Sequence, residues 1–282
     1  MEAKDINWYP GHMKKTRELI QESMRLVDAA LEVIDARIPV SSRNPIIDEL
    51  TRGRRRLVIL NKSDLSDAGE NARWEAFFSG RGDLPILMNC VSGEGARSLL
   101  RALDAVRAER EAAGRRRRPL RVMAVGIPNV GKSSLINRLV GRKSAKTGDR
   151  PGITRGKQWL ALGNGTQLLD TPGILWPKFE DPAVGLNLAF CGSVRDETMD
   201  AEWLALELVR TLADGYWGLL SARYGLEGAA GDDARATMEA IALRRGFLLQ
   251  GRRVDCARAA RTLLDEFRGG LIGRITLEKH GG

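Results

Sequence analysis

The chain has 282 residues, enough for one large domain or two domains of ordinary size. A hydrophobic content of 43% supports a folded core, and a formal net charge of +9 favours a polyanionic partner. The apolar runs are much shorter than a membrane span, and the polar N-terminal residues do not resemble a signal peptide. Three widely spaced cysteines favour reduced thiols over a disulfide or zinc framework, so we expect a cytoplasmic protein without membrane contact.

The first part of the chain is expected to alternate between helices and strands. Apolar runs rich in Leu, Ile and Val predict strands over residues 31–34, 57–60 and 85–88. Helices are expected over about 14–27, 45–50, 70–79 and 96–111. This alternation is typical of a parallel α/β sheet.

A basic segment at 114–119 is expected to be a linker, after which the alternation resumes. Strands are then expected over 122–125, 158–162 and 166–169, and a helix over 134–140. The polar segment 141–157, rich in Gly, Lys and Arg, is expected to be a mobile loop.

From about residue 200 the pattern indicates helices alone. We therefore expect two domains, an α/β domain over 1–195 and an all-helical domain over 196–282. Charge is uneven within the helical part, because residues 244–282 carry 9 basic and 4 acidic side chains, a net +5.

The strongest functional signal is the pattern Gly126, four residues, then Gly131-Lys132-Ser133. Between an apolar strand and a helix, this spacing is typical of the phosphate-binding loop of nucleoside triphosphatases. Main-chain N–H groups of such a loop point at phosphate oxygens, Lys132 adds positive charge there, and the Ser133 hydroxyl can ligate Mg²⁺. The nucleotide contacts expected here come from Asn129, Val130, Gly131, Lys132, Ser133 and Ser134.

The sequence Asn61-Lys62-Ser63-Asp64 directly follows an expected strand and matches the guanine-reading motif Asn-Lys-x-Asp. The Asp64 carboxylate can accept two hydrogen bonds from guanine, one from N1–H and one from the exocyclic amine. Adenine lacks this donor pair, so an adenine nucleotide would leave the carboxylate unpaired at a cost of roughly 1–3 kcal/mol. Asn61 is expected to hold the loop, and the Lys62 stem to cover a face of the ring. Together with the phosphate loop, the motif predicts a GTP and GDP site.

Two further segments are expected to act on the γ-phosphate and on Mg²⁺. Asp170-Thr171-Pro172-Gly173 matches the element Asp-x-x-Gly, in which Asp170 would act on Mg²⁺ through water and the Gly173 N–H would bind phosphate. Thr154, in Pro-Gly-Ile-Thr, is the better candidate for the second hydroxyl ligand of Mg²⁺. Thr147 lies nearer the helix and lacks the Pro-Gly context.

Spacing alone places Cys90 and Val91 where main-chain N–H groups usually back the base. The guanine motif and this base-backing loop usually come last among the GTPase motifs, after Asp-x-x-Gly, whereas here they precede the phosphate loop and the two segments that follow it. A circular permutation accounts for the order, with the old ends joined by the 114–119 linker. The segment after Gly173 then runs directly into the helical part, so nucleotide state could move that part.

Several motifs together resemble the ribosome biogenesis GTPase A family. They are Trp-Tyr-Pro-Gly-His-Met at 8–13, Asp-Ala-Arg at 35–37, Gly-Ile-Pro-Asn-Val-Gly-Lys-Ser at 126–133, Asp-Arg-Pro-Gly-Ile-Thr at 149–154 and Asp-Thr-Pro-Gly-Ile-Leu at 170–175, in permuted order. The resemblance covers about residues 6–195, and the helical part matches in length, placement and the ending Gly-Arg-Ile-Thr-Leu-Glu at 273–278. It implies a GTP hydrolase that joins late assembly of the large ribosomal subunit, binds rRNA and is stimulated by the particle.

Many GTPases place a glutamine after Asp-x-x-Gly to orient the attacking water, whereas this chain has Ile174, a substitution that marks the family. The resemblance singles out His12 to position water, so the expected catalytic residues are His12, Lys132 and Thr154. A potassium ion near the phosphates is another candidate, because Asn129 matches the asparagine that coordinates K⁺ in potassium-activated relatives. K⁺ there would stabilise the charge that an arginine finger stabilises elsewhere.

Structural roles compete with several of these interpretations. His12 can be a turn or helix-cap element, and Asn129 can simply stabilise its loop. Asp35-Ala36-Arg37 is expected to form an ion pair at a strand end. The runs Arg54–Arg56 and Arg115–Arg118 are either solvated charge or contacts to rRNA phosphates.

Two other functions remain open from the residues. One is an RNA-binding assembly scaffold in which the nucleotide is mainly structural, against which the intact Lys132, Ser133, Thr154 and Asp170 argue. The other is a permuted GTPase that acts on the small subunit or on tRNA, which only the family resemblance excludes. We expect the protein to be a monomer.

Overall fold

The computed structural model describes residues 18, 20–114, 118–141, 158–162, 164–170, 181–194, 199–231 and 233–281. The chain forms two compact units, Met1–Pro182 with Glu278–Gly282 and Ala183–Leu277. We call them the sheet unit and the helical unit. The contacts thus divide the chain at residue 182 rather than 195, and they return residues 278–282 to the sheet unit.

The sheet unit is built on a six-stranded sheet in the order β3-β2-β1-β4-β6-β5. The strands are β1 (Ala29–Asp35), β2 (Arg55–Asn61), β3 (Leu84–Met88), β4 (Leu120–Val125), β5 (Gln158–Ala161) and β6 (Thr166–Asp170). Neighbouring strands are parallel except β5 and β6, which form an antiparallel pair. Every residue of β1 is buried, as expected for a central strand covered on both faces. The strands predicted from apolar runs are confirmed.

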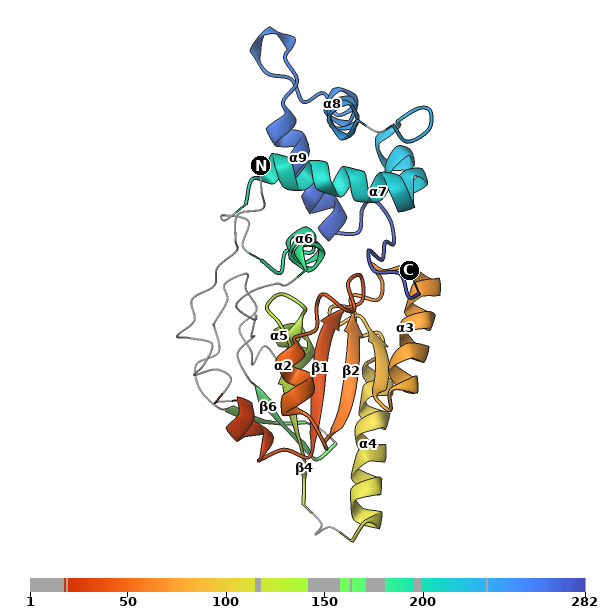
Figure 1. Ribbon diagram of the computed structural model, residues 1–282. Coiled ribbons are helices and arrows are strands. Elements are labelled where there is room, and N and C mark those ends of the chain that lie inside the picture. The colour runs from red at the N-terminus through yellow and green to blue at the C-terminus, as the bar shows by residue number, and fades with distance from the viewer. Residues whose placement is uncertain are drawn as a thin grey trace. The chain divides into compact units, whose positions relative to one another are not determined.

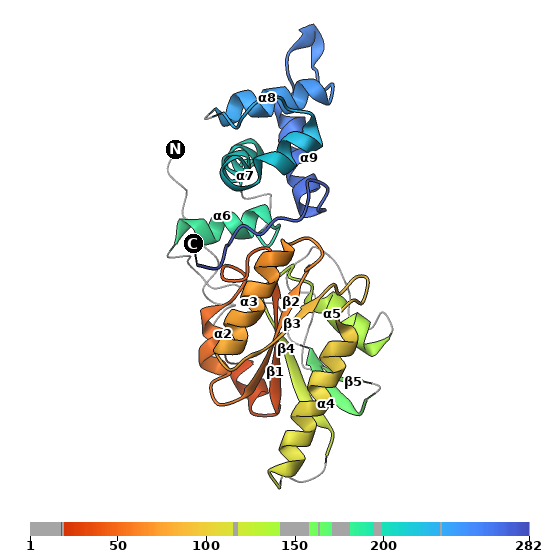
Figure 2. The same ribbon diagram turned by 90° about the vertical axis from the view of Figure 1, so that its right-hand side faces the viewer.

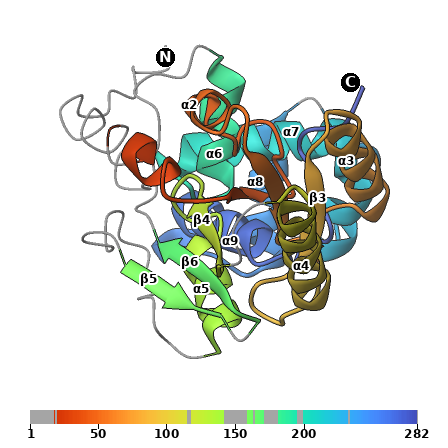
Figure 3. The same cartoon turned by 90° about the horizontal axis from the view of Figure 1, so that it is seen from below.

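Helices cover both faces of this sheet. They are α2 (Pro45–Leu50), α3 (Ala68–Gly80), α4 (Ala96–Ala112) and α5 (Lys132–Val140). Figure 2 shows α2 and α3 over one face and α4 and α5 over the other, and Figure 3 gives the view along the strands. Trp74 and Phe78 of α3 pack on Ile34, Val58 and Leu60 of the sheet.

The helix expected over 14–27 is seen only in part. Residues 20–24 are helical, and a turn at 25–26 ends the helix before the expected residue 27. The turn is held by the N–H of Leu26, which donates to the carbonyl of Ser23 over 2.9 Å. Ile20 and Met24 nevertheless lie in the core, where they pack with Ile47.

The helical unit contains α6 (Pro182–Phe190), α7 (Ala201–Tyr224), α8 (Ala234–Arg244) and α9 (Cys256–Arg268). Figure 1 shows α7, α8 and α9 packed on one another, which confirms a helical C-terminal region. Helix α6 begins before residue 200 and was not expected. Arg268 of α9 binds its C-terminal end by donating to the carbonyls of Ala189 and Phe190 over 2.9 and 3.0 Å.

Two features are absent from the described residues. None of their helices is long and apolar enough to cross a membrane. They also contain no cluster of His, Cys, Asp and Glu side chains that could hold a metal by themselves. All three cysteines are free thiols, and Cys90 and Cys191 are buried.

Candidate guanine-nucleotide site

The predicted nucleotide motifs meet at one edge of the sheet. The guanine motif follows β2, the base-backing loop follows β3, and the phosphate loop follows β4. These strands are parallel, so their carboxyl ends lie at the same edge, where open α/β sheets bind ligands. β6 runs parallel to β4, so the backbone of its last residue, Asp170, lies at the same edge of the sheet.

The phosphate loop is shaped by glycines that no larger residue could replace. Gly126 has φ 154°, and a Cβ added there would lie 2.5 Å from the Val33 carbonyl oxygen of β1. Gly131 has φ 98°, and its added Cβ would lie 2.1 Å from the Asn61 side-chain nitrogen. Asn129 also has positive φ, at 61°, and its side chain is exposed. The loop therefore depends on backbone that approaches its neighbours closely.

The start of α5 fits a phosphate group. Gly131 at the N-cap has no side chain, so no side-chain cap accepts from the first N–H groups of the helix. Such N–H groups, with the positive end of the helix dipole, favour an anion. Lys132, Ser133 and Ser134 occupy this first turn and are half-buried. At this point the Lys132 ammonium can donate hydrogen bonds to phosphate oxygens, and the Ser133 hydroxyl oxygen can ligate Mg²⁺.

Asn61 joins the three motif segments. Its side-chain nitrogen donates to the Val130 carbonyl in the phosphate loop over 2.7 Å. Its side-chain oxygen accepts from the Cys90 N–H in the base-backing loop over 3.0 Å. Because Asn61 is 3% exposed, both bonds are shielded from water. One side chain thus sets the spacing between the base end and the phosphate end of the site.

Lys62 lies in a buried ionic cluster. Its ammonium nitrogen is 2.8 Å from a carboxylate oxygen of Asp35, which also pairs with Arg37 over 2.8 Å. The ion pair expected within Asp35-Ala36-Arg37 is therefore confirmed, and Lys62 extends it. Burial alone would raise the pKa of Asp35, but Arg37 and Lys62 outweigh burial and hold the pKa well below its usual range.

Asp64 stands at the exposed tip of the turn that follows Lys62. Two hydrogen bonds hold this turn to the rest of the sheet unit. The Ser63 N–H donates to the Met88 carbonyl over 3.2 Å, and the Asn71 side chain donates to the Ser63 carbonyl over 3.1 Å. Lys62 itself has φ 60°, an unfavourable conformation that these bonds maintain. The carboxylate is thus presented to solvent on a rigid turn.

The base-backing loop is held by hydrogen bonds within the loop and to α5. The side-chain oxygen of Asn89 accepts from the Val91 and Ser92 N–H groups over 2.9 and 3.0 Å. Arg138 of α5 donates to the carbonyls of Cys90 and Val91. The N–H groups of Cys90 and Val91, expected to back the base, therefore already have acceptors in the protein. Sequence reasoning missed Asn89 and Arg138, although the loop spacing pointed to their neighbours.

Cys90 has no reactive thiol. Its side chain is buried, and burial raises the pKa of the thiol to about 12. A buried thiol with such a pKa stays protonated at neutral pH and is a poor nucleophile. Any role for this residue in the site belongs to its main chain.

The remaining predicted residues fall outside the described part of the chain. These are His12, Thr147, Thr154, Gly173 and Ile174, and for Asp170 the structure describes the backbone of β6. The structure therefore brings together the residues for the base and the phosphate loop. It does not test the residues assigned to the second magnesium hydroxyl, the γ-phosphate or the attacking water.

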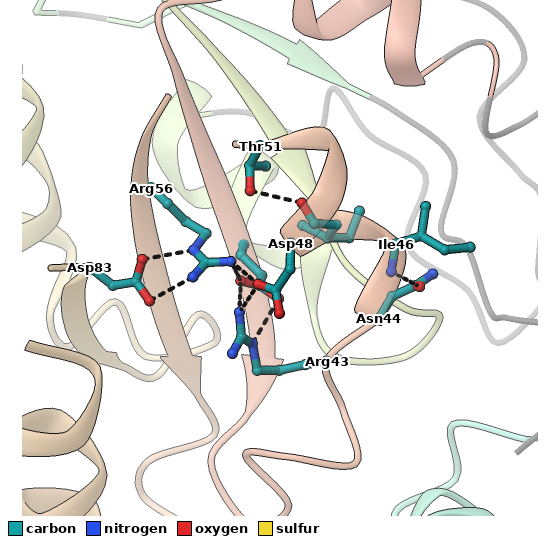
Figure 4. A network of polar contacts seen from close by, with 9 residues as sticks. Arg43, Asn44, Ile46, Asp48, Thr51, Arg56 and Asp83 are labelled. Carbon is teal, nitrogen blue, oxygen red and sulfur yellow. Dashed lines mark hydrogen bonds and ion pairs between the residues drawn. The ribbon is translucent and has the colours of Figure 1, made fainter. Parts of the chain in front are cut away.

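One of the two basic runs is engaged within the protein. Arg56 pairs with Asp83 over 2.8 Å and also contacts Asp48, as Figure 4 shows. Arg55 pairs with Glu109 over 2.8 Å, and Arg54 donates to the Val27 carbonyl over 2.6 Å. Arg56 thus holds β2 to α2 and Arg55 holds it to α4, and because all three guanidinium groups have partners within the protein, the structure speaks against rRNA contact through this run. In the other run, Arg118 pairs with Asp28 over 2.8 Å, and residues 115–117 are outside the described part.

A phosphate loop after β4 and a guanine motif after β2, tied together by Asn61, define a P-loop GTPase domain with circularly permuted motifs. Residues 121–208 match the family model described as "50S ribosome-binding GTPase". Ribosome biogenesis GTPase A of Bacillus cereus is 42% identical over 97% of this chain and 93% of its own length. Mitochondrial ribosome-associated GTPase 1 of Mus musculus is 36% identical over 99% of this chain and 92% of its own length.

Solved structures agree with these relatives. The GDP-bound structure of TM YlqF superposes with a TM-score of 0.68 at 28% identity, covering 94% of this chain and all of that one. The chain belongs to the ribosome biogenesis GTPase A family, and it is a GTP hydrolase.

Proposed function

We propose that this GTPase binds a precursor of the large ribosomal subunit and promotes its late assembly. The observation that carries this proposal is the similarity to Ribosome biogenesis GTPase A of Bacillus cereus along 97% of the chain. That similarity includes the helical unit as well as the sheet unit, so it extends beyond a shared nucleotide domain. The protein acts as a cytoplasmic monomer in this proposal.

In the nucleotide site, Asp64 reads the guanine edge and Lys62 covers the ring. The N–H groups of the phosphate loop and Lys132 hold the phosphates. Ser133 and Thr154 give hydroxyl ligands to Mg²⁺, Asp170 acts on it through water, and the Gly173 N–H binds the γ-phosphate. Mg²⁺ held by these residues would supply positive charge to neutralise charge on the β- and γ-phosphates during hydrolysis.

His12 orients the attacking water, because Ile174 has no group that could do so. Potassium held by Asn129 supplies further positive charge at the phosphates. Asn129 has an exposed side chain and a positive φ of 61°, and an exposed amide oxygen could reach an ion, which supports this role. Exchange of K⁺ for Na⁺ should lower the hydrolysis rate, and an equal rate in both salts would remove the potassium assignment.

The helical unit supplies an rRNA contact through the hairpin 247–254, between α8 and α9 (Figure 1). Leu248 and Val254 form its antiparallel bridge, and the Leu249 N–H donates to the Arg253 carbonyl over 2.8 Å. Leu248 and Leu249 are 48% and 47% exposed. Arg252 and Arg253 are exposed as well, and neither has an ion-pair partner among the described residues. Arginines that lack a carboxylate partner remain available to phosphates.

Hydrolysis measured with and without purified large-subunit precursors tests the proposed function. Because Ile174 stands where many GTPases have the water-orienting glutamine, we expect slow hydrolysis alone and a clear rise with precursors. Small-subunit precursors and tRNA are the controls, and they should leave the rate unchanged. A rate that large-subunit precursors fail to raise would favour an assembly scaffold with a structural nucleotide, and stimulation by the small subunit alone would redirect the partner.

A further inference from the structure

The chain leaves the helical unit at Leu277 and returns to the sheet unit. We call Glu278–Gly281 the return segment; it ends beside α3 (Figures 1 and 2). Its first residue completes the sequence Gly-Arg-Ile-Thr-Leu-Glu, for which the nucleotide site provides no role. This segment contacts the loop 36–43, which precedes the guanine motif in the chain, and helix α3, which follows the motif.

On one side, the Glu278 carboxylate binds the loop 36–43 that follows β1. It accepts from the Val40 N–H over 2.6 Å and from the Ser41 N–H over 2.9 Å, and the Ser41 hydroxyl also donates to it. A carboxylate that accepts several N–H and O–H donors forms strong, charge-assisted bonds. Glu278 therefore fixes the outer end of this loop.

The inner end of the same loop is built into the guanine motif. The Ala36 N–H donates to the Asn61 carbonyl over 2.8 Å. The Ser42 hydroxyl donates to the Ile38 carbonyl over 2.7 Å and accepts from the Asp35 N–H over 3.0 Å. Asp35 in turn holds Lys62. The loop thus forms a continuous set of bonds from Glu278 to the lysine of the guanine motif.

On the other side, the return segment packs on α3, the helix that begins just after the guanine motif. The Trp74 side-chain nitrogen donates to the Glu278 carbonyl over 2.9 Å, and the His280 N–H donates to Glu70 over 2.9 Å. The His280 ring lies 5.2 Å from the ring of Trp74 and 5.1 Å from that of Phe77. Asn71 of the same helix holds the turn that carries Asp64.

We propose that Glu278 is a positioning residue for guanine recognition, acting through the loop 36–43 and the Asp35–Lys62 pair. It fixes Lys62 at the base and thereby slows nucleotide release. Glu278 is the first residue of the sheet unit after Leu277, the last residue of the helical unit. The proposal rests on the assignment of Asn61–Asp64 as the guanine motif.

The test measures release of a fluorescent GDP analogue, and the affinities for GDP and for IDP, which lacks the exocyclic amine. In Glu278→Gln, the amide keeps the side-chain shape but loses the negative charge. We expect GDP release to accelerate by about fivefold, comparable to the loss of one hydrogen bond, and the preference for GDP over IDP to fall. Glu109→Gln is the matched control, because Glu109 pairs with Arg55 on the same unit away from the motif.

A double-mutant cycle with Lys62→Met separates positioning from general stability. If Glu278 acts through Lys62, the double variant releases GDP no faster than Lys62→Met alone. Equal release from Glu278→Gln and Glu109→Gln, or fully additive effects with Lys62→Met, would overturn the proposal. If Glu278→Gln does not fold, Ser41→Ala removes a single donor and serves in its place. Asp64→Asn tests the guanine motif itself, so failure of that assignment can be told apart from failure of the role given to Glu278. The assays contain no ribosomal particle, so they do not depend on the proposed partner.

Discussion

The side-chain nitrogen of Asn61 donates to the carbonyl of Val130 over 2.7 Å, and this bond joins the guanine motif to the phosphate loop. The two residues are far apart in the sequence, on either side of the permutation linker. The same asparagine accepts from Cys90, so one amide group connects three loops from three strands. The relative placement of base and phosphates in the site follows from this amide.

Replacement of Asn61 by alanine should therefore weaken nucleotide binding as well as folding. It leaves the Val130 carbonyl and the Cys90 N–H buried without these partners, at a cost of about 1–3 kcal/mol each. We expect a lower free energy of unfolding in urea and faster release of GDP. Asn164→Ala, in the turn before β6, is the control and should change neither by a comparable amount. Unchanged GDP release in Asn61→Ala would contradict the role given to this side chain.

Gly131→Ala should abolish nucleotide binding, because its Cβ would lie 2.1 Å from the Asn61 side chain. Gly141→Ala is the matched control. Gly141 also has positive φ, 72°, but a Cβ there meets nothing within 4 Å, so it carries the backbone penalty alone. Titration with labelled GDP should show binding by the Gly141 variant and loss by the Gly131 variant. Similar affinities in the two variants would mean that the close approach to Asn61 is unimportant.

Asp35→Asn should destabilise the protein by about 3–5 kcal/mol at neutral pH, because Arg37 would keep a buried charge without its counter-ion. The pKa of Asp35 is lowered by folding, so its stabilising effect is present above the unfolded pKa and is lost as pH falls below it. Urea unfolding as a function of pH should show the largest difference from the wild type near pH 7. The difference should shrink below about pH 4, the usual pKa of aspartate. A difference that grows toward acid would contradict the ion pair.

Thiol labelling should distinguish the cysteines. Cys90 is buried with its pKa raised to about 12, whereas Cys256 is only half-buried. At pH 8 a maleimide or disulfide reagent should modify Cys256 first and leave Cys90 unmodified until the protein unfolds. Peptide mass spectrometry after short labelling gives the order, with urea-unfolded protein as the reference. Early labelling of Cys90 would show that the base-backing loop opens in solution.

The hairpin 247–254 can be tested by removal of its two exposed arginines. Arg252→Ala with Arg253→Ala should weaken binding to large-subunit rRNA. The slope of log affinity against log salt concentration should become shallower by about one for each phosphate that the variant no longer binds. Arg97→Ala with Arg101→Ala, on exposed positions of α4, removes the same charge and serves as the control. If both pairs weaken binding equally, the hairpin contributes only through net charge.

The sequence predicted the strands, the permuted order and the nucleotide motifs, because these depend on local apolar runs and fixed spacings. It also predicted the Asp35–Arg37 ion pair, whose partners are two residues apart. Contacts between distant segments could not be predicted in this way. Nothing local to Arg138 indicates that it binds the carbonyls of Cys90 and Val91, and nothing near Glu278 indicates a return to Val40.

Charge runs were the least reliable signal. Arg54–Arg56 fitted solvated charge and a phosphate-binding surface equally well, yet the structure engages each guanidinium within the protein. Their partners, Glu109 and Asp83 among them, come from other elements. Because pairing of this kind depends on tertiary structure, a basic run by itself does not locate an RNA surface.

We further propose that GTP switches the affinity of this protein for a large-subunit precursor. Co-sedimentation with purified precursors, at one salt concentration and with either a non-hydrolysable GTP analogue or GDP, tests this switch most directly. We predict that the protein pellets with the precursor in the GTP-analogue state and remains largely in the supernatant with GDP. Equal co-sedimentation in the two states would contradict the switch.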